Sequence, residues 1–245
     1  MKGQTLFISD LHLCESRPHI TSAFVDWLAE VASKADALYI LGDFFEYWAG
    51  DDAMFDDFHR PIIQSLRQLT QAHTQLYLMH GNRDFLIREA FLNATGAQLL
   101  NDPTLTQIYG NQILLSHGDA LCTDDVQYMA FRAQVRQPAW QEAFLSQPMT
   151  QRQAFIQEAR AKSEHAKSTK MAAIMDVNTE TLHHFLREYD YPPILIHGHT
   201  HRPKHHLHAF DGHICERYVL GDWYEQGSYL KLNADGSIVT QTIPI

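Results

Sequence analysis

Five short segments of the sequence carry side chains that commonly bind metal ions, and each segment directly follows an apolar run. The segments are Asp10-Leu11-His12, Gly42-Asp43, Gly81-Asn82-Arg83-Asp84, His117-Gly118-Asp119 and His197-Gly198-His199-Thr200-His201. Together they offer carboxylate, amide and imidazole ligands, a mixture that suits Mn, Fe or Zn, whereas Mg and Ca favour sites richer in oxygen. The sequence therefore predicts a metal centre built from residues that lie far apart along the chain.

Two of the segments repeat a ligand at i and i+2, in the pairs Asp10/His12 and His197/His199. Side chains two residues apart point the same way while the chain stays extended, so each pair can serve one centre. Each segment also has an ordinary structural interpretation. Asp after Gly is common in turns, Asn-Arg-Asp can cap a helix that begins near Phe85, and a strand-end His is often a surface residue. The occurrence of all five segments in this order, each after a strand, favours metal binding.

The apolar runs that precede the segments predict buried strands. The runs lie at residues 6–8, 38–41, 76–79, 113–115 and 194–196. Apolar residues at helical spacing predict helices over residues 20–31 and 62–69. Strands that alternate with helices form βαβ units in a largely parallel sheet, and ligands collect at the carboxyl ends of such strands. We therefore expect an α/β fold with all five segments in one crevice.

The rest of the chain departs from this alternation. Residues 122–176 show helical patterns without strands, which predicts a helical insertion in a core made of residues 1–121 and 177–245. A chain of 245 residues suits one domain with such an insertion. Short apolar runs near the end predict strands that close a second sheet or lengthen the first, at residues 214–220, 228–232 and 238–243.

Charge is distributed unevenly between the predicted core and the insertion. The formal net charge is −10, with 19 Lys+Arg against 29 Asp+Glu. Residues 126–175 contain seven basic and three acidic residues, so this window carries +4 and the remainder −14. A basic helical segment with apolar faces suits an anionic amphipathic ligand or a membrane surface, although an ordinary solvated face has the same composition. The acidic remainder argues against nucleic-acid binding, which depends on Lys and Arg.

The sequence shows no feature of a secreted or membrane-spanning protein. Cys14, Cys122 and Cys215 form no disulfide framework, which fits a reducing cytosol. Asp10 interrupts the first apolar run before a signal peptide could form, and no run approaches the ~18 apolar residues that span a bilayer. We therefore expect any contact with a membrane to be peripheral.

Further polar residues near these segments are interpreted as supporting groups. Asp84, Asp119 and His201 are better placed to orient ligands than to bind metal themselves. A second cluster comprises His205, His206 and His208, which lie on a predicted edge strand with no carboxylate paired to them. We interpret this cluster as solvated surface residues.

The ordered set of segments resembles the calcineurin-like metallophosphoesterase superfamily, whose pattern is DxH…GD…GN(H/R)(D/E)…H…GHxH, and the match runs from Asp10 to His201. Longer strings are similar to the UDP-2,3-diacylglucosamine pyrophosphatase (hydrolase) family of lipid A biosynthesis. These strings are residues 80–86, 121–125, 174–178 and 196–203. The resemblance implies a calcineurin-like β-sandwich flanked by helices, with the insertion as a helical cap.

The resemblance also implies two divalent metal ions, which we expect to be Mn²⁺. Asp43 would bridge the ions and hold the water between them. The first ion would be held by Asp10, His12, Asp43 and His199, and the second by Asp43, Asn82, His117 and His197.

The substrate contacts implied by the family come from both the core and the insertion. They are Asn82, Arg83, Asp125, Ser163, Lys167, Lys170 and His197. Arg83 stands where many superfamily members have histidine, and because Arg does not deprotonate in proteins it is predicted to clamp phosphate rather than donate a proton. Ser163, Lys167 and Lys170 are spaced i, i+4, i+7 on one helical face. Apolar insertion residues such as Phe144 are candidates either for an acyl groove or for core packing.

The implied reaction is hydrolysis of the pyrophosphate bond of UDP-2,3-diacylglucosamine, in which a metal-activated water attacks the α-phosphorus and gives UMP and 2,3-diacylglucosamine 1-phosphate. Such a lipid-linked substrate would place the enzyme, as a peripheral monomer, at the cytoplasmic face of the bacterial inner membrane. One alternative is a phosphoesterase of the same fold that acts on a soluble nucleotide or phosphoprotein. Another is a non-catalytic scaffold, which failure to bind divalent metal would favour.

Overall fold

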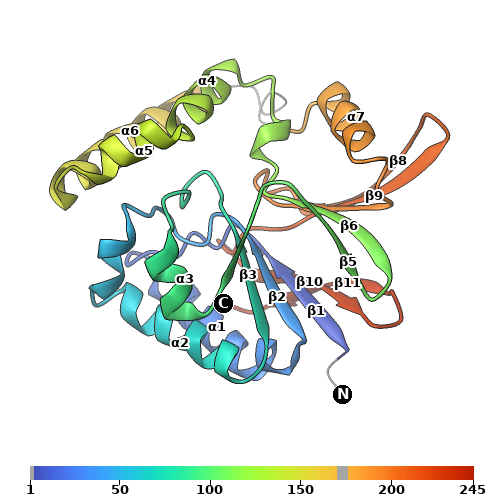
Figure 1. The fold of residues 1–245 in the computed structure, drawn as a ribbon, viewed down its shortest axis with the longest axis horizontal. Helices are drawn as coiled ribbons and strands as arrows, with labels where there is room; N and C mark the ends of the chain where they lie inside the picture. The colour runs from blue at the N-terminus through green and yellow to red at the C-terminus, as the bar shows by residue number, and fades with distance from the viewer. Residues whose placement is uncertain (1–2, 170–175) are drawn as a thin grey trace.

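The structure is a computed structural model that describes residues 3–169 and 176–245, with the side chains of residues 162–169 outside that description. Two sheets run through the described chain (Figure 1). The first has the order β11-β10-β1-β2-β3-β4, with β1 (Gln4–Ile8), β2 (Ala37–Leu41), β3 (Gln75–Met79), β4 (Gln98–Leu100), β10 (Gly227–Asn233) and β11 (Ile238–Ile243). The second has the order β5-β6-β7-β9-β8, with β5 (Thr104–Ile108), β6 (Asn111–Ser116), β7 (Ile194–His197), β8 (Lys204–Phe210) and β9 (His213–Val219).

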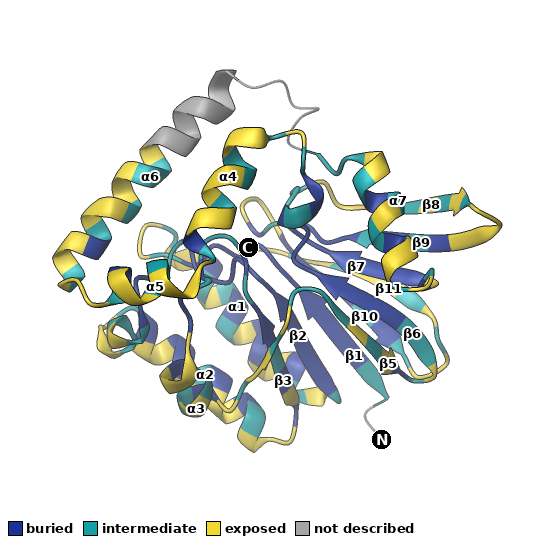
Figure 2. Ribbon diagram, turned by 45° about the horizontal axis from the view of Figure 1, so that its top comes forward, coloured by how far each residue is buried: buried dark blue, intermediate teal, exposed yellow. Residues whose placement is uncertain are grey.

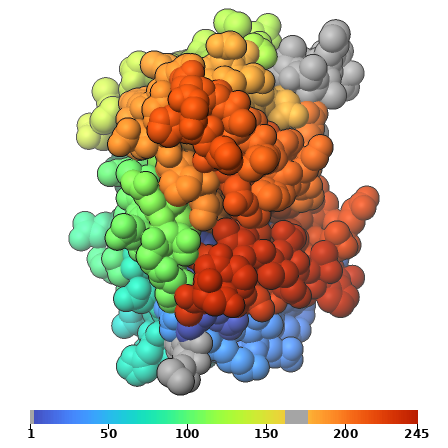
Figure 3. Space-filling view, turned by 90° about the vertical axis from the view of Figure 1, so that its right-hand side faces the viewer, coloured from blue at the N-terminus to red at the C-terminus, as the bar shows by residue number. Residues whose placement is uncertain are grey.

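Both sheets mix parallel and antiparallel pairs. Strands β1 to β4 are parallel, β10 pairs antiparallel with β1, and β11 pairs antiparallel with β10 at the edge of that sheet. In the second sheet β6, β7 and β9 are parallel, whereas β5 and β8 form antiparallel edges. The late strands therefore fulfil both predicted roles, because β8 and β9 complete the second sheet while β10 and β11 lengthen the first. Figure 3 shows this last part of the chain covering much of one face of the molecule.

The elements pack in four layers, with the two sheets in the middle and helices on both outer faces. Helices α1 (Pro18–Glu30), α2 (His59–Gln71) and α3 (Glu89–Thr95) cover the outer face of the first sheet, and α7 (Thr179–Glu188) covers that of the second (Figure 1). In β1, Leu6 and Ile8 pack under the helices while Phe7 packs between the sheets. Burial on both faces explains why the central strands are continuous apolar runs. The predicted α/β sandwich flanked by helices is confirmed.

Three further helices follow one another without an intervening strand, as predicted for the insertion. They are α4 (Val126–Val135), α5 (Pro138–Leu145) and α6 (Met149–Thr169). They lie together at one end of the molecule and are more exposed than the strands (Figures 1 and 2). Arg152 of α6 connects them to the core, since its guanidinium donates to Ala49 O and pairs with Asp52. The domain bounds given above stay a prediction.

The segment after β3 is a turn and not the start of a helix. Helix α3 begins at Glu89, so the expectation of a helix near Phe85 is wrong. The Asp84 carboxylate accepts hydrogen bonds from the backbone N–H groups of Gly81 at 2.8 Å and Phe44 at 2.7 Å. Asp84 therefore joins the turns after β2 and β3 instead of capping a helix. Three short 3₁₀ helices, at Ala32–Lys34, Asp51–Phe55 and Asp119–Leu121, complete the connections.

Candidate metal centre

The predicted segments meet at the carboxyl ends of their strands. Asp10 follows β1, Asp43 follows β2 and His117 follows β6, and all three are buried. Backbone hydrogen bonds join the neighbouring turns, from His12 N to Asp43 O at 3.0 Å and from Asp10 N to Gly42 O at 3.1 Å. Adjacent strands of both sheets thus hold the side chains in one crevice, as strand-end loops of an α/β fold do.

Asp43 faces two sets of side chains. Its Oδ2 lies 3.7 Å from His12 Nε2, and its Oδ1 lies 3.8 Å from His117 Nε2. The first set is Asp10, His12 and His201, whose possible ligand atoms all lie within 4.8 Å of one another. Asp10, Asp43 and His117 form a second group of the same kind.

An amide and a further imidazole extend the second set. Asn82 Oδ1 lies 3.2 Å from His117 Nε2 and 2.9 Å from His199 Nδ1. His117 Nδ1 donates to Leu41 O at 2.9 Å, which leaves its Nε2 directed into the crevice. A histidine held in this way by its other nitrogen is the usual arrangement of a metal ligand.

The atoms in the crevice fit divalent cations. Asp10 Oδ1 is buried and, among the residues that the structure describes, accepts no hydrogen bond, although His201 Nε2 lies 3.3 Å away. The Nε2 atoms of His12 and His201 face each other at 3.2 Å. Buried carboxylates are normally hydrogen-bonded or paired, and oxygen and imidazole atoms gathered around a common point are the ligands that such cations use. These clusters are typical of dimetal phosphoesterases.

His197 does not fit its predicted role as a metal ligand and substrate contact. It is the last residue of β7 and is fully buried. Its Nδ1 donates to Gly198 O at 2.9 Å, and its Nε2 accepts from the Arg217 guanidinium at 3.1 Å. Burial and the charge of Arg217 lower the pKa of His197 to about 4, so the ring is neutral. Because both ring nitrogens are engaged, no lone pair remains for a metal ion.

His201 lies beside Asp10 and His12, where His199 was expected. It was predicted only to orient ligands, yet it belongs to the group with Asp10 and His12. The Gly-His-x-His string occupies residues 198–201, so its two histidines are His199 and His201. The pair of histidines in the crevice is therefore His199 and His201, whereas His197 and His199 were predicted.

Several of the candidate ligands share an unusual backbone conformation. Positive φ angles occur at Asp10 (55°), His12 (50°), Asp43 (51°), His199 (68°) and His201 (53°). The paired ligands therefore do not converge on extended chain, as the i, i+2 argument assumed. Residues other than glycine rarely adopt this left-handed region, and such strain gathers at functional sites.

Electrostatics in the crevice favour bound protons or cations. Burial, together with the charge of Asp10, raises the pKa of Asp43 to about 7. Burial alone would lower the pKa of His117, but the carboxylates of Asp43 and Asp10 outweigh it and raise this pKa to about 9. The metal-free centre thus retains protons that a metal ion would displace.

A cavity of about 680 Å³ opens beside the ligand clusters and is walled on its other side by the insertion. The insertion side is largely aromatic, with Trp140 stacked on Phe144 at 4.9 Å between ring centroids and Phe144 against Phe155 at 5.4 Å. Phe144 is also part of the core, whereas Phe155 is 41% exposed. Core packing and cavity lining are therefore both roles of these side chains.

Among the described residues, three arginines gather around the buried carboxylate of Glu46, which lines this cavity. Glu46 pairs with Arg83 at 3.7 Å, with Arg160 of α6 at 2.8 Å and with Arg17 at 2.5 Å. No motif marked Glu46 or Arg160. The only signal for Glu46 was its position three residues after Asp43.

The remaining predicted substrate contacts divide into two groups. Asn82, Arg83 and Asp125 line the cavity, and Asp125 also caps α4 by accepting from Tyr128 N at 3.1 Å. The side chains of Ser163 and Lys167, and the whole of Lys170, lie outside the described residues.

Asp119 was predicted to orient ligands, and its hydrogen bonds connect it to the insertion. Its Oδ2 accepts from Tyr128 at 2.6 Å and from Arg132 at 2.8 Å, both on α4. The Tyr128 ring in turn stacks against His199, with 5.8 Å between the ring centroids. Asp119 therefore joins the first helix of the insertion to the metal centre.

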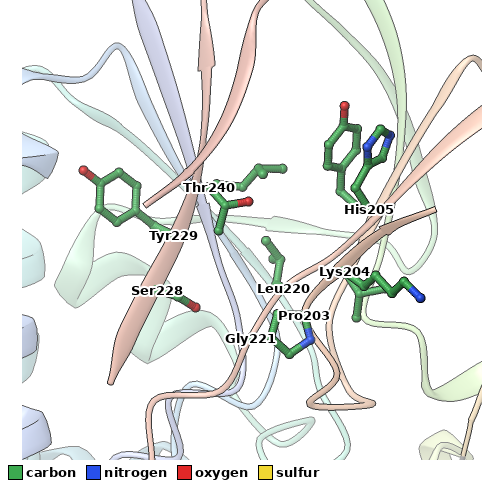
Figure 4. Close-up of a pocket in the computed structure, with 11 residues that line it drawn as sticks. Pro203, Lys204, His205, Leu220, Gly221, Ser228, Tyr229 and Thr240 are labelled. Atoms are coloured by element: carbon green, nitrogen blue, oxygen red, sulfur yellow. The ribbon is translucent and has the colours of Figure 1, made fainter. Parts of the chain in front are cut away.

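A second cavity, of about 110 Å³, lies away from this centre between β8, β9 and β10 (Figure 4). His205 lies on edge strand β8 as predicted, and its ring stacks on Tyr218. Its Nε2 is 2.9 Å from a carboxylate oxygen of Glu216, so the interpretation of this histidine as lacking a carboxylate partner is wrong. His208 is likewise engaged, because its Nε2 accepts from Arg217. None of the predicted site residues belongs to the described lining of this cavity.

The family model for calcineurin-like phosphoesterases matches residues 3–203. The chain therefore belongs to the calcineurin-like phosphoesterase family. Within that family, the UDP-2,3-diacylglucosamine hydrolase of Aromatoleum aromaticum is 50% identical over 231 residues, which cover 94% of each chain. The protein of the same name from Cellvibrio japonicus is 47% identical over 234 residues, or 95% of this chain and 96% of that one. The family resemblance inferred from the motifs is confirmed. Among the described helices, none is long and apolar enough to cross a membrane.

Proposed function

We propose that this chain hydrolyses the pyrophosphate bond of UDP-2,3-diacylglucosamine to UMP and 2,3-diacylglucosamine 1-phosphate, a step of lipid A biosynthesis. The observation that carries the proposal is a cluster of metal-type ligands that opens into a cavity with an aromatic wall. A substrate that joins a diphosphate to acyl chains needs both surfaces side by side. The names of relatives that are 50% and 47% identical support this substrate.

The proposal includes two divalent ions, taken to be Mn²⁺. Asp10, His12, Asp43 and His201 would hold one ion, and Asp43, Asn82, His117 and His199 the other. Ions held there would lower the pKa of a coordinated water and would offset negative charge on the phosphate oxygens. Asp43 is the residue whose two carboxylate oxygens face both sets, so it is assigned the bridging position.

The remaining roles follow from charge and position. Arg83 clamps the diphosphate and stabilises the negative charge that develops on the phosphate oxygens, since a guanidinium is cationic and offers several N–H donors. Asn82 and Asp125 contact the substrate head group from the cavity wall. Ser163, Lys167 and Lys170 are assigned to the same head group on the family resemblance, and their helical spacing agrees with it. The acyl chains occupy the aromatic part of the cavity.

The point of attack is assigned to the α-phosphorus and can be tested with labelled water. Turnover in H₂¹⁸O should place the label in UMP, because the new P–O bond forms on the phosphorus that UMP retains. Label in 2,3-diacylglucosamine 1-phosphate would overturn the assignment.

The substrate assignment is tested by a Mn²⁺-dependent assay on UDP-2,3-diacylglucosamine beside a lipid-free UDP-sugar. We expect cleavage of the lipid substrate with a much higher kcat/KM, because only that substrate fills the aromatic cavity. Comparable kcat/KM on both would favour a soluble nucleotide substrate, and a protein that binds no divalent metal would favour the scaffold alternative.

The proposed location is the cytoplasmic face of the bacterial inner membrane, with peripheral attachment through the basic insertion. Sedimentation with vesicles that contain anionic lipid should carry the protein down, and rising salt should release it, because screening weakens charge attraction. Binding that ignores both lipid charge and salt would contradict this attachment.

A further inference from the structure

Three consecutive residues in the loop between β9 and β10 contact the first set of candidate ligands, which is Asp10, His12 and His201. The loop lies outside residues 3–203, the part of the chain that the family model matches. Asp222 Oδ2 is 3.1 Å from His201 Nδ1. The next residue, Trp223, donates its backbone N–H to Asp10 O at 3.3 Å. The third residue, Tyr224, stacks on His12 with 5.5 Å between ring centroids and 20° between ring planes.

Trp223 anchors this loop to the core. Its side chain is fully buried and its indole N–H donates to Ser228 O at 3.1 Å. The ring packs edge-on against Phe24 and Trp27 under the first sheet. Because the central residue is fixed, its two neighbours are held against the metal centre independently of any bound ion.

The contact between Asp222 and His201 determines which ring nitrogen is available. The Asp222 carboxylate accepts the Nδ1–H, so Nε2, which faces Asp10 at 3.3 Å and His12 at 3.2 Å, is the nitrogen that would give up its proton to an ion. On the opposite side of the centre, His117 is oriented by a backbone carbonyl, that of Leu41. A carboxylate partner fixes the tautomer of a histidine ligand and increases its basicity more than a carbonyl does.

We propose that Asp222 is a positioning residue for the ion on the His12 and His201 side, and that Tyr224 restricts rotation of His12. The inference rests on the metal ligands assigned under the proposed function, but it does not depend on the substrate. It assigns a role in metal binding to a loop that carries none of the sequence motifs of the site.

The test measures metal affinity without substrate. Titration calorimetry with Mn²⁺, on protein stripped of metal, should show that Asp222→Ala weakens one of two sites by about 10- to 100-fold and leaves the other unchanged. Asp222→Asn keeps an oxygen acceptor without the charge and should give an intermediate loss. The visible spectrum of the Co²⁺-loaded protein should change in the same variants, which a purely structural role would not produce.

Matched controls separate orientation from folding. Asp211→Asn removes an aspartate that pairs with Arg187 on the surface and should leave both affinities unchanged. The thermal midpoint of metal-free Asp222→Ala should stay near that of the wild type, because Trp223 still anchors the loop. Wild-type affinity at both sites in Asp222→Ala, or a wild-type chain that binds no divalent ion, would overturn the inference. Failure to cleave UDP-2,3-diacylglucosamine would refute the proposed function alone, since the affinities are read without it.

Discussion

Asp43 presents one carboxylate oxygen to each side of the candidate metal centre, at 3.7 Å from His12 and 3.8 Å from His117. Asp43→Asn keeps the shape of the side chain but removes the charge that both ions would share. We expect metal content to fall from two ions to one or none and kcat to fall at least ~100-fold, since even partners of ligands cost about 10- to 100-fold. Elemental analysis and steady-state kinetics measure both quantities. Unchanged metal content and turnover would remove Asp43 from the bridging position.

The assignment of His201 instead of His197 as a metal ligand can be tested by substituting each residue. His201→Gln should lose one ion, because its Nε2 faces Asp10 and His12. His197→Gln should keep both ions but lower the free energy of unfolding by about 1–3 kcal/mol, because it disturbs the acceptor of the buried Arg217 guanidinium. Metal analysis with chemical denaturation of both variants decides the point. Loss of an ion only in His197→Gln would restore the original assignment.

Among the elements, helix α6 is joined to the core by the buried side chain of Arg152, in addition to the pair of Arg160 with Glu46. Arg152 is 4% exposed, and its guanidinium donates to Gln147 O and Ala49 O and pairs with Asp52. Arg152→Ala leaves those carbonyls without a donor and should cost about 1–3 kcal/mol. Because α6 walls the cavity, KM for the lipid substrate should rise more than kcat falls. Arg67→Ala, on the exposed face of α2, is the control and should change neither. A global loss of kcat with unchanged KM would contradict this role for α6.

The strands that are buried on both faces are among the elements that the sequence predicted. Strand β2 is buried at every residue and reads as an uninterrupted apolar run. Strand β4 has only three residues, and α7 buries only Leu182 and Leu186. These elements obtain their apolar contacts from distant parts of the chain, so local patterns did not identify them.

The same reasoning explains which parts of the site were predictable. Ligand types at strand ends identified Asp10, His12 and Asp43. The spacing could not choose between His197 and His201, since either forms an i, i+2 pair with His199. Arg217, on a different strand, makes the choice by occupying His197. Asp222 and Glu46 went unnoticed for a similar reason, because their partners come from elsewhere in the sequence.

At the scale of the whole molecule, metal binding and pH should be linked through stability. Burial raises the pKa of Asp43 from 3.8 to about 7. Burial would lower the pKa of His117, but the nearby carboxylates outweigh this effect and raise it from 6.5 to about 9. Both folded-state values exceed the unfolded ones. Their contribution to the stability of the metal-free protein is therefore complete below the unfolded values and is lost as pH rises through 7 and then 9.

Metal ions reverse this trend, because binding replaces those protons and becomes tighter as they leave. The rise in thermal midpoint on adding Mn²⁺ should consequently be larger at pH 8 than at pH 6, and a chelator should abolish it. A free Mn²⁺ concentration of 100 times Kd adds about 2.7 kcal/mol per site to the free energy of unfolding, which calorimetry detects readily. Asp43→Asn, which lacks the shared carboxylate, should show a smaller increment with a weaker pH dependence. An increment in the wild type that is the same at both pH values would mean that the ions bind elsewhere than at this protonated, buried centre.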